Sequence, residues 1–255
     1  MHDKYYAKWD NFDFNYFSGI KRSEIDRRNE WINFYKNKLP KFILNKKNKK
    51  SLDIGCGYGG CVSAFKRLKF DAFGVDVQKR CINKAKRNFP NAKFVLGTID
   101  NLIKSKYVNF DIITLHDVLE HIADPDDLIK KCKKILSKKG KIFIKVPNAQ
   151  SLQINMLKEY SWEISAPFHR TLFSLQGLKK LSLKYKLKVE KSFDDINTWG
   201  WTRGLSIKNK IEQNYEFLRK NKYFVKLDYN IDLLFENISK RVDQKSILFI
   251  VLKNK

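Results

Sequence analysis

The chain is long enough and apolar enough to bury a core, and it is strongly basic. Of its 255 residues, 43% are hydrophobic and 14% are aromatic, which excludes global disorder and fits one sizeable domain. The formal net charge of +25 fits a partner that carries phosphates. Only ten of the 52 basic residues are Arg, and a Lys-rich composition equally fits an AT-rich genome, so both explanations of the charge stay open.

The apolar runs and the cysteines exclude two further classes of protein. The longest uncharged apolar run, Ile247 to Leu252, is far shorter than the roughly 18 to 20 residues that span a bilayer, and the N-terminus lacks an apolar signal core. The four cysteines form no C-x-x-C pair, which argues against zinc and against a disulfide framework. We therefore expect a cytoplasmic protein with no membrane insertion and no metal ion.

In chain order, an aromatic-rich stretch comes first, and strands then alternate with helices. Aromatic side chains before Leu44 recur at roughly helical spacing and predict a helical cap over residues 1–45. Five short apolar runs predict strands over residues 51–54, 72–77, 93–96, 110–116 and 141–146. Polar-faced stretches predict helices over residues 60–69, 78–88, 126–137 and 175–185, with Gly140 ending the third.

This alternation predicts an α/β fold, a three-layer, Rossmann-like, doubly wound sheet that is mostly parallel. Two later apolar runs, residues 186–193 and 246–252, bracket a polar helical insertion over residues 203–242. A strand that returns after such an excursion suits antiparallel insertion into the sheet. We predict a single domain over residues 1–255, with a cofactor-binding core over residues 50–195 and a closing strand over residues 246–252.

A glycine-rich turn follows the first predicted strand. Asp53 and Ile54 lead into the run Gly55-Cys56-Gly57-Tyr58-Gly59, and such glycines let a ligand approach the backbone at a helix N-terminus. Asp76 ends the second predicted strand, 21 residues after Gly55, a spacing at which a carboxylate accepts hydrogen bonds from ribose hydroxyls. Together the two signals predict a nucleotide-type cofactor.

The chemical nature of that cofactor follows from Asp53. A carboxylate two residues before the first glycine repels the pyrophosphate of a dinucleotide and attracts an amine. S-adenosyl-L-methionine carries an ammonium and a sulfonium and no phosphate. We therefore predict this cofactor, with S-adenosyl-L-homocysteine as its product, and we disfavour a dinucleotide-dependent oxidoreductase.

The same turn resembles the D-x-G-x-G-x-G motif of class I S-adenosylmethionine-dependent methyltransferases. The run from Phe110 to His121 with Asp124-Pro125 resembles the fourth-strand segment of the small-molecule branch of that family, which contains quinone-biosynthesis O-methyltransferases and many envelope-glycan methyltransferases. Val146-Pro147-Asn148 and the run from Phe168 to Ser174 also resemble that branch. The resemblance covers about residues 50–193 and the closing strand.

By that resemblance, the glycine turn holds the methionine end of the cofactor, the second strand its ribose, and the loop after the third strand its adenine. The family often has Asp directly after the glycine that ends the third strand, whereas this chain reads Gly97-Thr98-Ile99-Asp100. Either Asp100 or the Thr98 hydroxyl is left for the adenine. The implied cofactor-binding residues are Asp53, Gly55, Gly57, Gly59, Asp76, Val77, Thr98, Ile99, Asp100 and Leu115.

Two histidines are candidates for catalysis. Methyl transfer is an in-line displacement, so a base is needed only if the acceptor is a protonated hydroxyl. His121 follows Asp117 by four residues, so on a helix the two share a face and Asp117 orients the imidazole as a base. The alternative is that His121 only holds the turn. His169, in a loop expected over the site, is the second candidate, against an ordinary surface histidine.

Four residues are candidates for binding the acceptor. Arg170, beside His169, is a candidate anchor for a carboxylate or phosphate. Trp199 and Arg203 are candidates for an aromatic wall and a basic clamp, against packing on the inserted helices. Asn148 belongs to the resembling Val-Pro-Asn segment.

We expect a methyltransferase that modifies an oxygen, or with less support a nitrogen, of a small anionic acceptor. A nucleotide-linked sugar or a phosphorylated metabolite of cell-surface glycan synthesis fits that description. An RNA methyltransferase is one alternative, although the run from His116 to Leu119 stands where base-amino methylators carry an Asn/Asp-Pro-Pro-aromatic motif. A catalytically silent partner subunit is the other alternative. The sequence leaves the oligomeric state open.

Overall fold

The structure, a computed structural model, describes residues 23–38, 49–161, 163–164, 168–195, 230, 234 and 246–255. The chain divides into two compact units. The first comprises Met1–His116, Asp126–Phe143 and Lys253–Lys255, and the second comprises Asp117–Pro125 and Ile144–Leu252. Each unit is described by itself.

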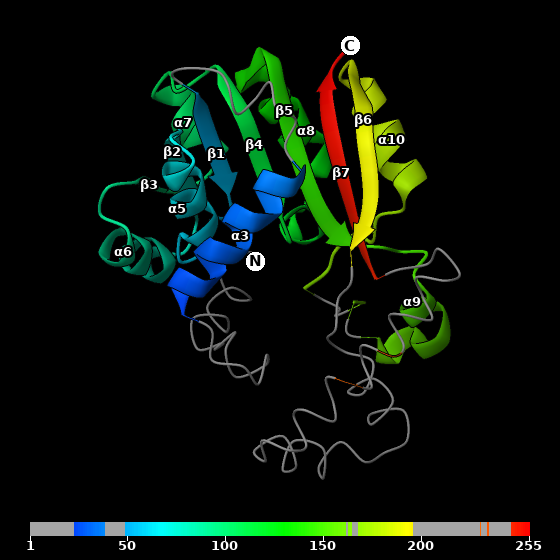
Figure 1. The fold of residues 1–255 in the computed structure, drawn as a ribbon. Helices are drawn as coiled ribbons and strands as arrows, with labels where there is room; N and C mark the ends of the chain where they lie inside the picture. The colour runs from blue at the N-terminus through cyan, green and yellow to red at the C-terminus, as the bar shows by residue number, and fades with distance from the viewer. Residues whose placement is uncertain are drawn as a thin grey trace. The chain divides into compact units, whose positions relative to one another are not determined.

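Seven strands form one sheet in the order β3-β2-β1-β4-β5-β7-β6 (Figure 1). They are β1 (Lys50–Ile54), β2 (Asp71–Asp76), β3 (Lys93–Leu96), β4 (Phe110–His116), β5 (Leu136–Pro147), β6 (Leu187–Asp195) and β7 (Ile247–Asn254). β1 pairs in parallel with β2 and β4, and β2 pairs in parallel with β3. The arrow of β7 runs opposite to those of β5 and β6 in Figure 1. The predicted mostly parallel sheet with an antiparallel last strand is confirmed.

In the first unit, the helices pack on a strand core that is buried on both faces. Leu52 of β1 and Ile112 and Ile113 of β4 are completely buried, as expected of parallel strands covered by helices. Helix α5 (Gly60–Arg67) packs on β1 and β2, and α3 (Glu24–Lys38) packs on α5. Helix α6 (Lys79–Asn88) packs on β2 and β3. The described part of this unit also contains helices α7 (Ile99–Lys104) and α8 (Pro125–Ile135).

The second unit joins the end of β5 to strands β6 and β7. Helix α10 (Leu175–Lys184) packs on β6, and the predicted closing run Ile247 to Leu252 is buried along its whole length within β7. A short helix, α9 (Leu152–Leu157), and two 3₁₀ turns, η2 (Leu119–His121) and η3 (Lys158–Tyr160), complete the described part of this unit.

The type of sheet was predicted better than some of the element bounds. β5 begins at Leu136 rather than near Lys141, and Gly140 lies inside the strand instead of ending a helix. A Cβ atom at position 140 would lie 2.7 Å from the backbone oxygen of Phe110, so the two strands approach closely only because this residue is glycine. Helices α7 and α9 were not predicted. Most of the cap and nearly all of the insertion over residues 203–242 lie outside the described residues.

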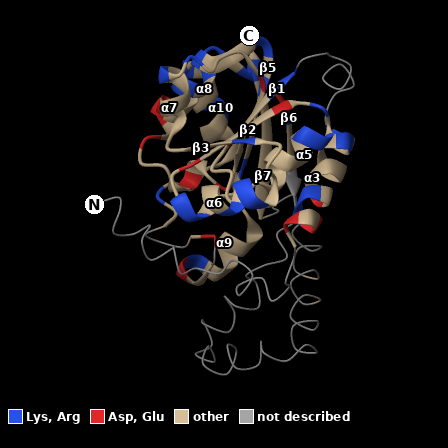
Figure 2. Ribbon diagram, turned by 90° about the vertical axis from the view of Figure 1, so that its left-hand side faces the viewer, with Lys and Arg blue, Asp and Glu red and all other residues tan. Residues whose placement is uncertain are grey.

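The basic side chains are distributed over several elements. Figure 2 shows Lys and Arg on helices α3, α5, α6 and α8, on the part of the chain that the structure describes. None of the helices in the described ranges is long and apolar enough to cross a membrane.

Candidate functional site

The glycine turn between β1 and α5 is a left-handed stretch held to β2. Gly55, Gly57 and Gly59 have φ angles of 70°, 50° and 89°. At Gly59 a Cβ atom would also lie 2.8 Å from the Phe94 ring, so both the backbone angle and the space require glycine there. The amides of Gly55 and Cys56 donate to the carbonyl of Val75, at 2.9 and 3.1 Å.

Asp76, at the end of β2, is hydrogen-bonded to this turn, a contact that the sequence did not predict. Its carboxylate accepts hydrogen bonds from the amides of Gly57, at 2.9 Å, and Gln78, at 2.8 Å. Burial raises the pKa of this carboxyl, and the backbone donors oppose the shift. Asp76 therefore fixes the turn to the end of β2.

Asp53, near the end of β1, is a buried carboxyl. It is 4% exposed, and the Thr114 hydroxyl on the adjacent strand β4 donates to its Oδ1 at 2.5 Å. Burial raises the pKa of Asp53 to about 7, while the bond from Thr114 lowers it and the nearby Asp76 carboxyl raises it. A carboxyl in this setting favours a cationic partner, because a positive charge beside it restores the ionised form.

A chain of buried polar contacts leads from Asp53 toward helix α3. The Cys61 thiol lies 4.0 Å from the Thr114 hydroxyl and 3.7 Å from the Tyr35 hydroxyl. The Tyr35 hydroxyl lies 3.0 Å from Nε2 of His116, the last residue of β4. Trp31 stacks on the His116 ring, with centroids 4.2 Å apart and an interplanar angle of 8°. The spacing of these aromatic residues predicted a helix, but no local motif in the sequence indicates the chain of polar contacts.

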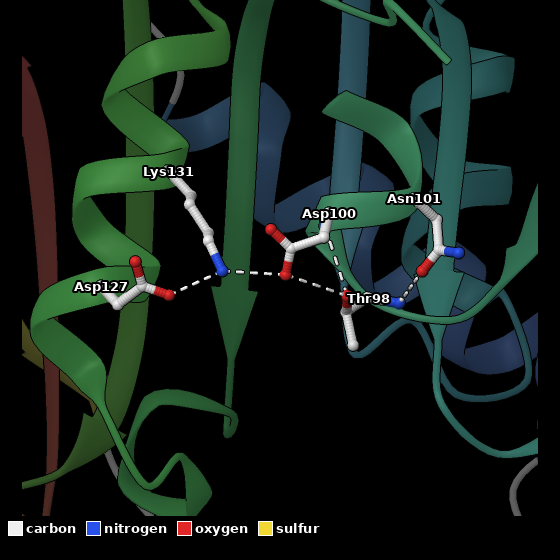
Figure 3. Close-up of polar contacts among 5 residues, drawn as sticks. All are labelled: Thr98, Asp100, Asn101, Asp127 and Lys131. Carbon is white, nitrogen blue, oxygen red and sulfur yellow. Dashed lines mark hydrogen bonds and ion pairs between the residues drawn. The ribbon is translucent and has the colours of Figure 1, made fainter. Parts of the chain in front are cut away.

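Thr98 and Asp100, the two residues predicted to contact the adenine, already have partners within the loop after β3 and its neighbours. Thr98 caps helix α7 by accepting from the amide of Asp100 at 3.3 Å, and Asn101 completes a capping box by accepting from the Thr98 amide at 2.8 Å. Lys131 lies between Asp100, at 2.8 Å, and Asp127, at 2.6 Å (Figure 3). The hydrogen bond from Lys131 lowers the pKa of Asp100. Both residues therefore have structural roles in this turn.

Two exposed apolar side chains lie at the carboxyl ends of β2 and β3. Val77 is 52% exposed and Leu96 is 46% exposed, whereas Ile99 and Leu115 are buried. Leu96, which no sequence motif marks, is a further candidate for contact with a flat ring.

In the second unit, two separate chain segments bring His121 and His169 together. The 3₁₀ turn η2 carries Glu120 and His121, and the amides of Arg170 and Thr171 donate to the Glu120 carbonyl at 2.7 and 3.2 Å. This backbone attachment sets the two imidazole rings edge to face, with centroids 4.8 Å apart. The sequence predicted both histidines as candidates but not their contact.

Each imidazole is oriented by a backbone carbonyl. Nδ1 of His121 lies 3.0 Å from the oxygen of Phe168, and Nδ1 of His169 lies 2.7 Å from the oxygen of Glu163. A carbonyl only accepts, so Nδ1 carries the proton in both rings and the lone pair of the neutral imidazole is on Nε2. Burial lowers the pKa of both histidines, which favours this neutral form.

A buried carboxyl completes this cluster, which we call the Glu120–His121–His169 cluster. Glu120 is 1% exposed, and its Oε2 has no hydrogen-bond partner among the described residues. Burial raises the pKa of this carboxyl well above its ordinary value, and the charge of Asp117 raises it further. One ligand atom from each of the three residues lies within 4.8 Å of the others, so they could hold a metal ion. Cysteine spacing in the sequence gives no sign of this cluster, because its ligand-type groups are one carboxyl and two imidazoles.

Asp117 does not share a helical face with His121, contrary to the expectation from their spacing. It precedes η2 with a φ of 53°, and its carboxylate pairs with Lys145 Nζ at 2.8 Å. The Phe168 carbonyl, rather than a carboxylate, contacts Nδ1 of His121. The spacing argument assumed a continuous helix, whereas the segment forms a left-handed residue followed by a 3₁₀ turn.

The four residues predicted to bind the acceptor have different settings. Asn148 is 8% exposed, and its side chain accepts from the Gln150 amide at 3.0 Å, which gives it a turn-forming role. The Arg170 side chain is exposed. Trp199 and Arg203 lie outside the described residues.

The comparison with known families agrees with this geometry. Residues 24–192 match a family described as a methyltransferase domain. The chain belongs to this methyltransferase family. Its predicted class, a class I enzyme that uses S-adenosyl-L-methionine, is thereby confirmed.

Curated relatives of this methyltransferase include ubiquinone biosynthesis O-methyltransferases. The one from Coxiella burnetii (strain Dugway 5J108-111) is 28% identical over 192 residues, which cover 74% of this chain and 76% of the relative. The one from Acinetobacter baylyi is also 28% identical, over 105 residues that cover 39% of this chain and 44% of the relative. The match thus spans less than half of the length of the Acinetobacter protein.

Other solved structures share the fold. The plantazolicin methyltransferase BamL, solved in complex with a triazolic desmethylPZN analog and SAH, has a TM-score of 0.62 and 18% identity, and the match covers 99% of this chain and 94% of BamL. The PH0226 protein from Pyrococcus horikoshii OT3 has a TM-score of 0.60 and 18% identity, with 99% of each chain covered. At this identity the likeness shows the fold alone.

Proposed function

We propose that this methyltransferase transfers a methyl group from S-adenosyl-L-methionine to a hydroxyl oxygen of a small acceptor. The observation that carries the proposal is the pair of imidazoles in the second unit, each with Nδ1 against a backbone carbonyl and with the lone pair on Nε2. A hydroxyl acceptor must lose a proton, and two oriented neutral imidazoles suit that step. An amine acceptor needs such groups less, so nitrogen is the less supported acceptor.

The described contacts support a placement of the methyl donor in the first unit. The Asp53 carboxylate takes the ammonium of the methionine end, because it is the buried anion beside the glycine turn. Asp76 accepts from the ribose hydroxyls, and Val77 and Leu96 cover the adenine with apolar surface. Gly55, Gly57 and Gly59 leave three positions of the turn without side chains, where the cofactor approaches the backbone, and the buried Ile99 and Leu115 belong to the same proposed site.

The reaction is an in-line displacement. The acceptor oxygen forms a bond to the methyl carbon while the carbon–sulfur bond breaks, and its electron pair stays on sulfur to give neutral S-adenosyl-L-homocysteine. The hydroxyl proton leaves toward the His121–His169 pair. The protein mainly aligns oxygen and methyl carbon at about 3 Å and keeps the oxygen unprotonated.

The acceptor class rests on charge and on the relatives. The net charge of +25 and the exposed Arg170 beside His169 favour an anionic group on the acceptor, as in a nucleotide-linked sugar or a phosphorylated metabolite. The relatives' name, ubiquinone biosynthesis O-methyltransferase, adds hydroxylated aromatic rings to the classes worth testing. Cytoplasmic localisation remains part of the proposal.

The test is turnover with a panel of hydroxylated acceptors. The purified full chain is incubated with S-adenosyl-L-methionine and phenolic, sugar-nucleotide or RNA acceptors, and formation of S-adenosyl-L-homocysteine is followed. With an accepted substrate, His121→Ala and His169→Ala should lower kcat about 100-fold or more, because activation of the hydroxyl is lost. Affinity for S-adenosyl-L-homocysteine should change less than about twofold.

Glu159→Gln is the control, because Glu159 is an exposed carboxylate of η3 outside the cluster. Unchanged turnover in both histidine variants would contradict the roles given to them. Methylation of RNA and of no small acceptor would favour the nucleic-acid alternative, and absence of cofactor binding would favour a silent partner subunit.

A further inference from the structure

The Glu120–His121–His169 cluster has the composition of a cation site rather than of a packed core. Glu120 places a carboxyl at 1% exposure in the protein, and its Oε2 has no hydrogen-bond partner among the described residues. Leaving a buried carboxylate oxygen unpaired is costly. A cation bound between Glu120 and the imidazoles would remove that cost.

The contacts around the cluster match the supporting shell of a metal centre. Histidines that ligate a metal with one ring nitrogen usually donate the other N–H to a carbonyl or carboxylate, which fixes the tautomer and the ring orientation. Both rings here have that arrangement, with Nδ1 at 3.0 Å from the Phe168 oxygen and at 2.7 Å from the Glu163 oxygen. The ligand atoms of the cluster lie within 4.8 Å of one another, a separation that a single ion can bridge.

A second group of ligand-type residues, Asp53, Cys61 and His116, lies in the first unit. Its atoms are already engaged, since Asp53 Oδ1 accepts from Thr114 and His116 Nε2 lies 3.0 Å from the Tyr35 hydroxyl. This group therefore does not compete as a metal site.

We propose that Glu120, His121 and His169 bind one divalent first-row transition-metal cation. Two imidazoles and one carboxylate form a donor set that suits Zn²⁺, Mn²⁺, Fe²⁺ or Co²⁺ better than Ca²⁺ or Mg²⁺, which prefer oxygen ligands. Three protein ligands leave coordination positions open. Such open positions can take a hydroxyl or a pair of hydroxyls from a bound ligand.

The role of the ion, though not its binding, rests on the proposed function. A divalent cation bound to the acceptor oxygen lowers the pKa of the hydroxyl and stabilises the oxygen anion. In the metal-bound chain the histidines are ligands and the hydroxyl proton passes to water, whereas in the metal-free chain the proton passes to an imidazole, as in the proposed function. The methyl transfer itself is unchanged, because the carbon–sulfur electron pair still goes to sulfur.

Metal binding can be measured without any acceptor. The full chain is freed of metal with a chelator, any affinity tag is removed, and Co²⁺ is added while visible absorption is recorded. We expect d–d bands that saturate at one ion per chain. Glu120→Gln and His169→Ala should each weaken Co²⁺ binding at least about tenfold. Glu120→Gln keeps the size of the side chain, and circular dichroism checks that both variants fold.

Two controls locate the ion. Glu159→Gln makes the same chemical change on an exposed carboxylate and should leave Co²⁺ binding unchanged. Cys61→Ser alters the other ligand-type group and should also leave it unchanged. Absence of binding with Co²⁺, Mn²⁺ and Zn²⁺, wild-type affinity in Glu120→Gln, or loss of binding in Cys61→Ser would overturn the proposal.

The outcomes also separate this proposal from the proposed function. Metal binding without methylation of any hydroxyl would leave the site standing and contradict the function. Hydroxyl methylation that is unaffected by chelation, in a chain that binds none of the three ions, would contradict the metal site and leave the imidazoles as bases.

Discussion

At the scale of single residues, Asp53 combines burial with a charge that the cofactor needs. It is 4% exposed and burial raises its pKa to about 7, so near neutral pH it is poised between the charged and neutral forms. The Thr114 hydroxyl limits this rise by donating to Oδ1. Proton uptake by this one group therefore decides how well a neighbouring ammonium is held.

This predicts that cofactor affinity depends on pH. Below a pKa of about 7 the neutral Asp53 lacks the charge that pairs with the ammonium, so affinity for S-adenosyl-L-homocysteine should fall as pH falls from 7 to 5.5, approaching about tenfold per unit. Calorimetric titration at several pH values measures it. Asp53→Asn should bind weakly and with little pH dependence, and a flat profile for the wild-type chain would contradict the placement of the ammonium.

At the scale of elements, the motif-bearing strands were predictable because their signals are local. The predicted bounds of β3 and β4 are those observed, since short apolar runs with turn residues at both ends define them. Helix α7 was missed because Thr98 and Asp100 were assigned to the cofactor, whereas Thr98 and Asn101 form a capping box. The η2 turn was missed because four-residue spacing also suits a helix.

The His121–His169 contact could not be predicted from the sequence. The two histidines belong to segments that are far apart in the chain, and the amides of Arg170 and Thr171 bring them together by bonding to the Glu120 carbonyl. Backbone hydrogen bonds of this kind leave no residue-type pattern. The buried position of Glu120, at 1% exposure, is equally a consequence of tertiary packing.

Alanine substitution should change the free energy of unfolding differently at Gly74, in β2, and at Gly177, in α10. A Cβ atom at Gly74 would lie 2.8 Å from Cys56 Sγ and from a methyl group of Val62, so Gly74→Ala should lower the free energy of unfolding by about 1–3 kcal/mol. At Gly177 in α10 the nearest atom is the Ser174 hydroxyl oxygen at 3.4 Å, so Gly177→Ala should be neutral or stabilise by up to about 1 kcal/mol.

Urea denaturation of both variants measures this contrast. Gly74→Ala should also weaken cofactor binding, because Cys56 belongs to the glycine turn. Equal stability of the two variants would show that the β2–turn packing has room that the distances do not indicate.

At the scale of the whole molecule, the net charge of +25 predicts unspecific affinity for polyanions. In the described chain, the Lys and Arg side chains are spread over α3, α5, α6 and α8 (Figure 2). We expect RNA to bind at about 50 mM salt and to be released by about 200 mM salt, because counterion release dominates such binding. Filter binding measures this, and labelled methyl transfer into RNA should stay at background. Sustained binding at high salt with methyl incorporation would contradict the small-acceptor proposal.

The alkylation rate of the buried cysteines can report how often the glycine turn opens. All four are buried and none forms a disulfide. Burial raises the thiol pKa of Cys56, in the turn, and of Cys61, at the start of α5, well above the ordinary value. An alkylating reagent attacks thiolates, so it reaches these sulfurs mainly when the turn opens. The rate of Cys56 alkylation thus counts openings of the turn, and an occupied cofactor site should slow it in proportion to the time spent bound.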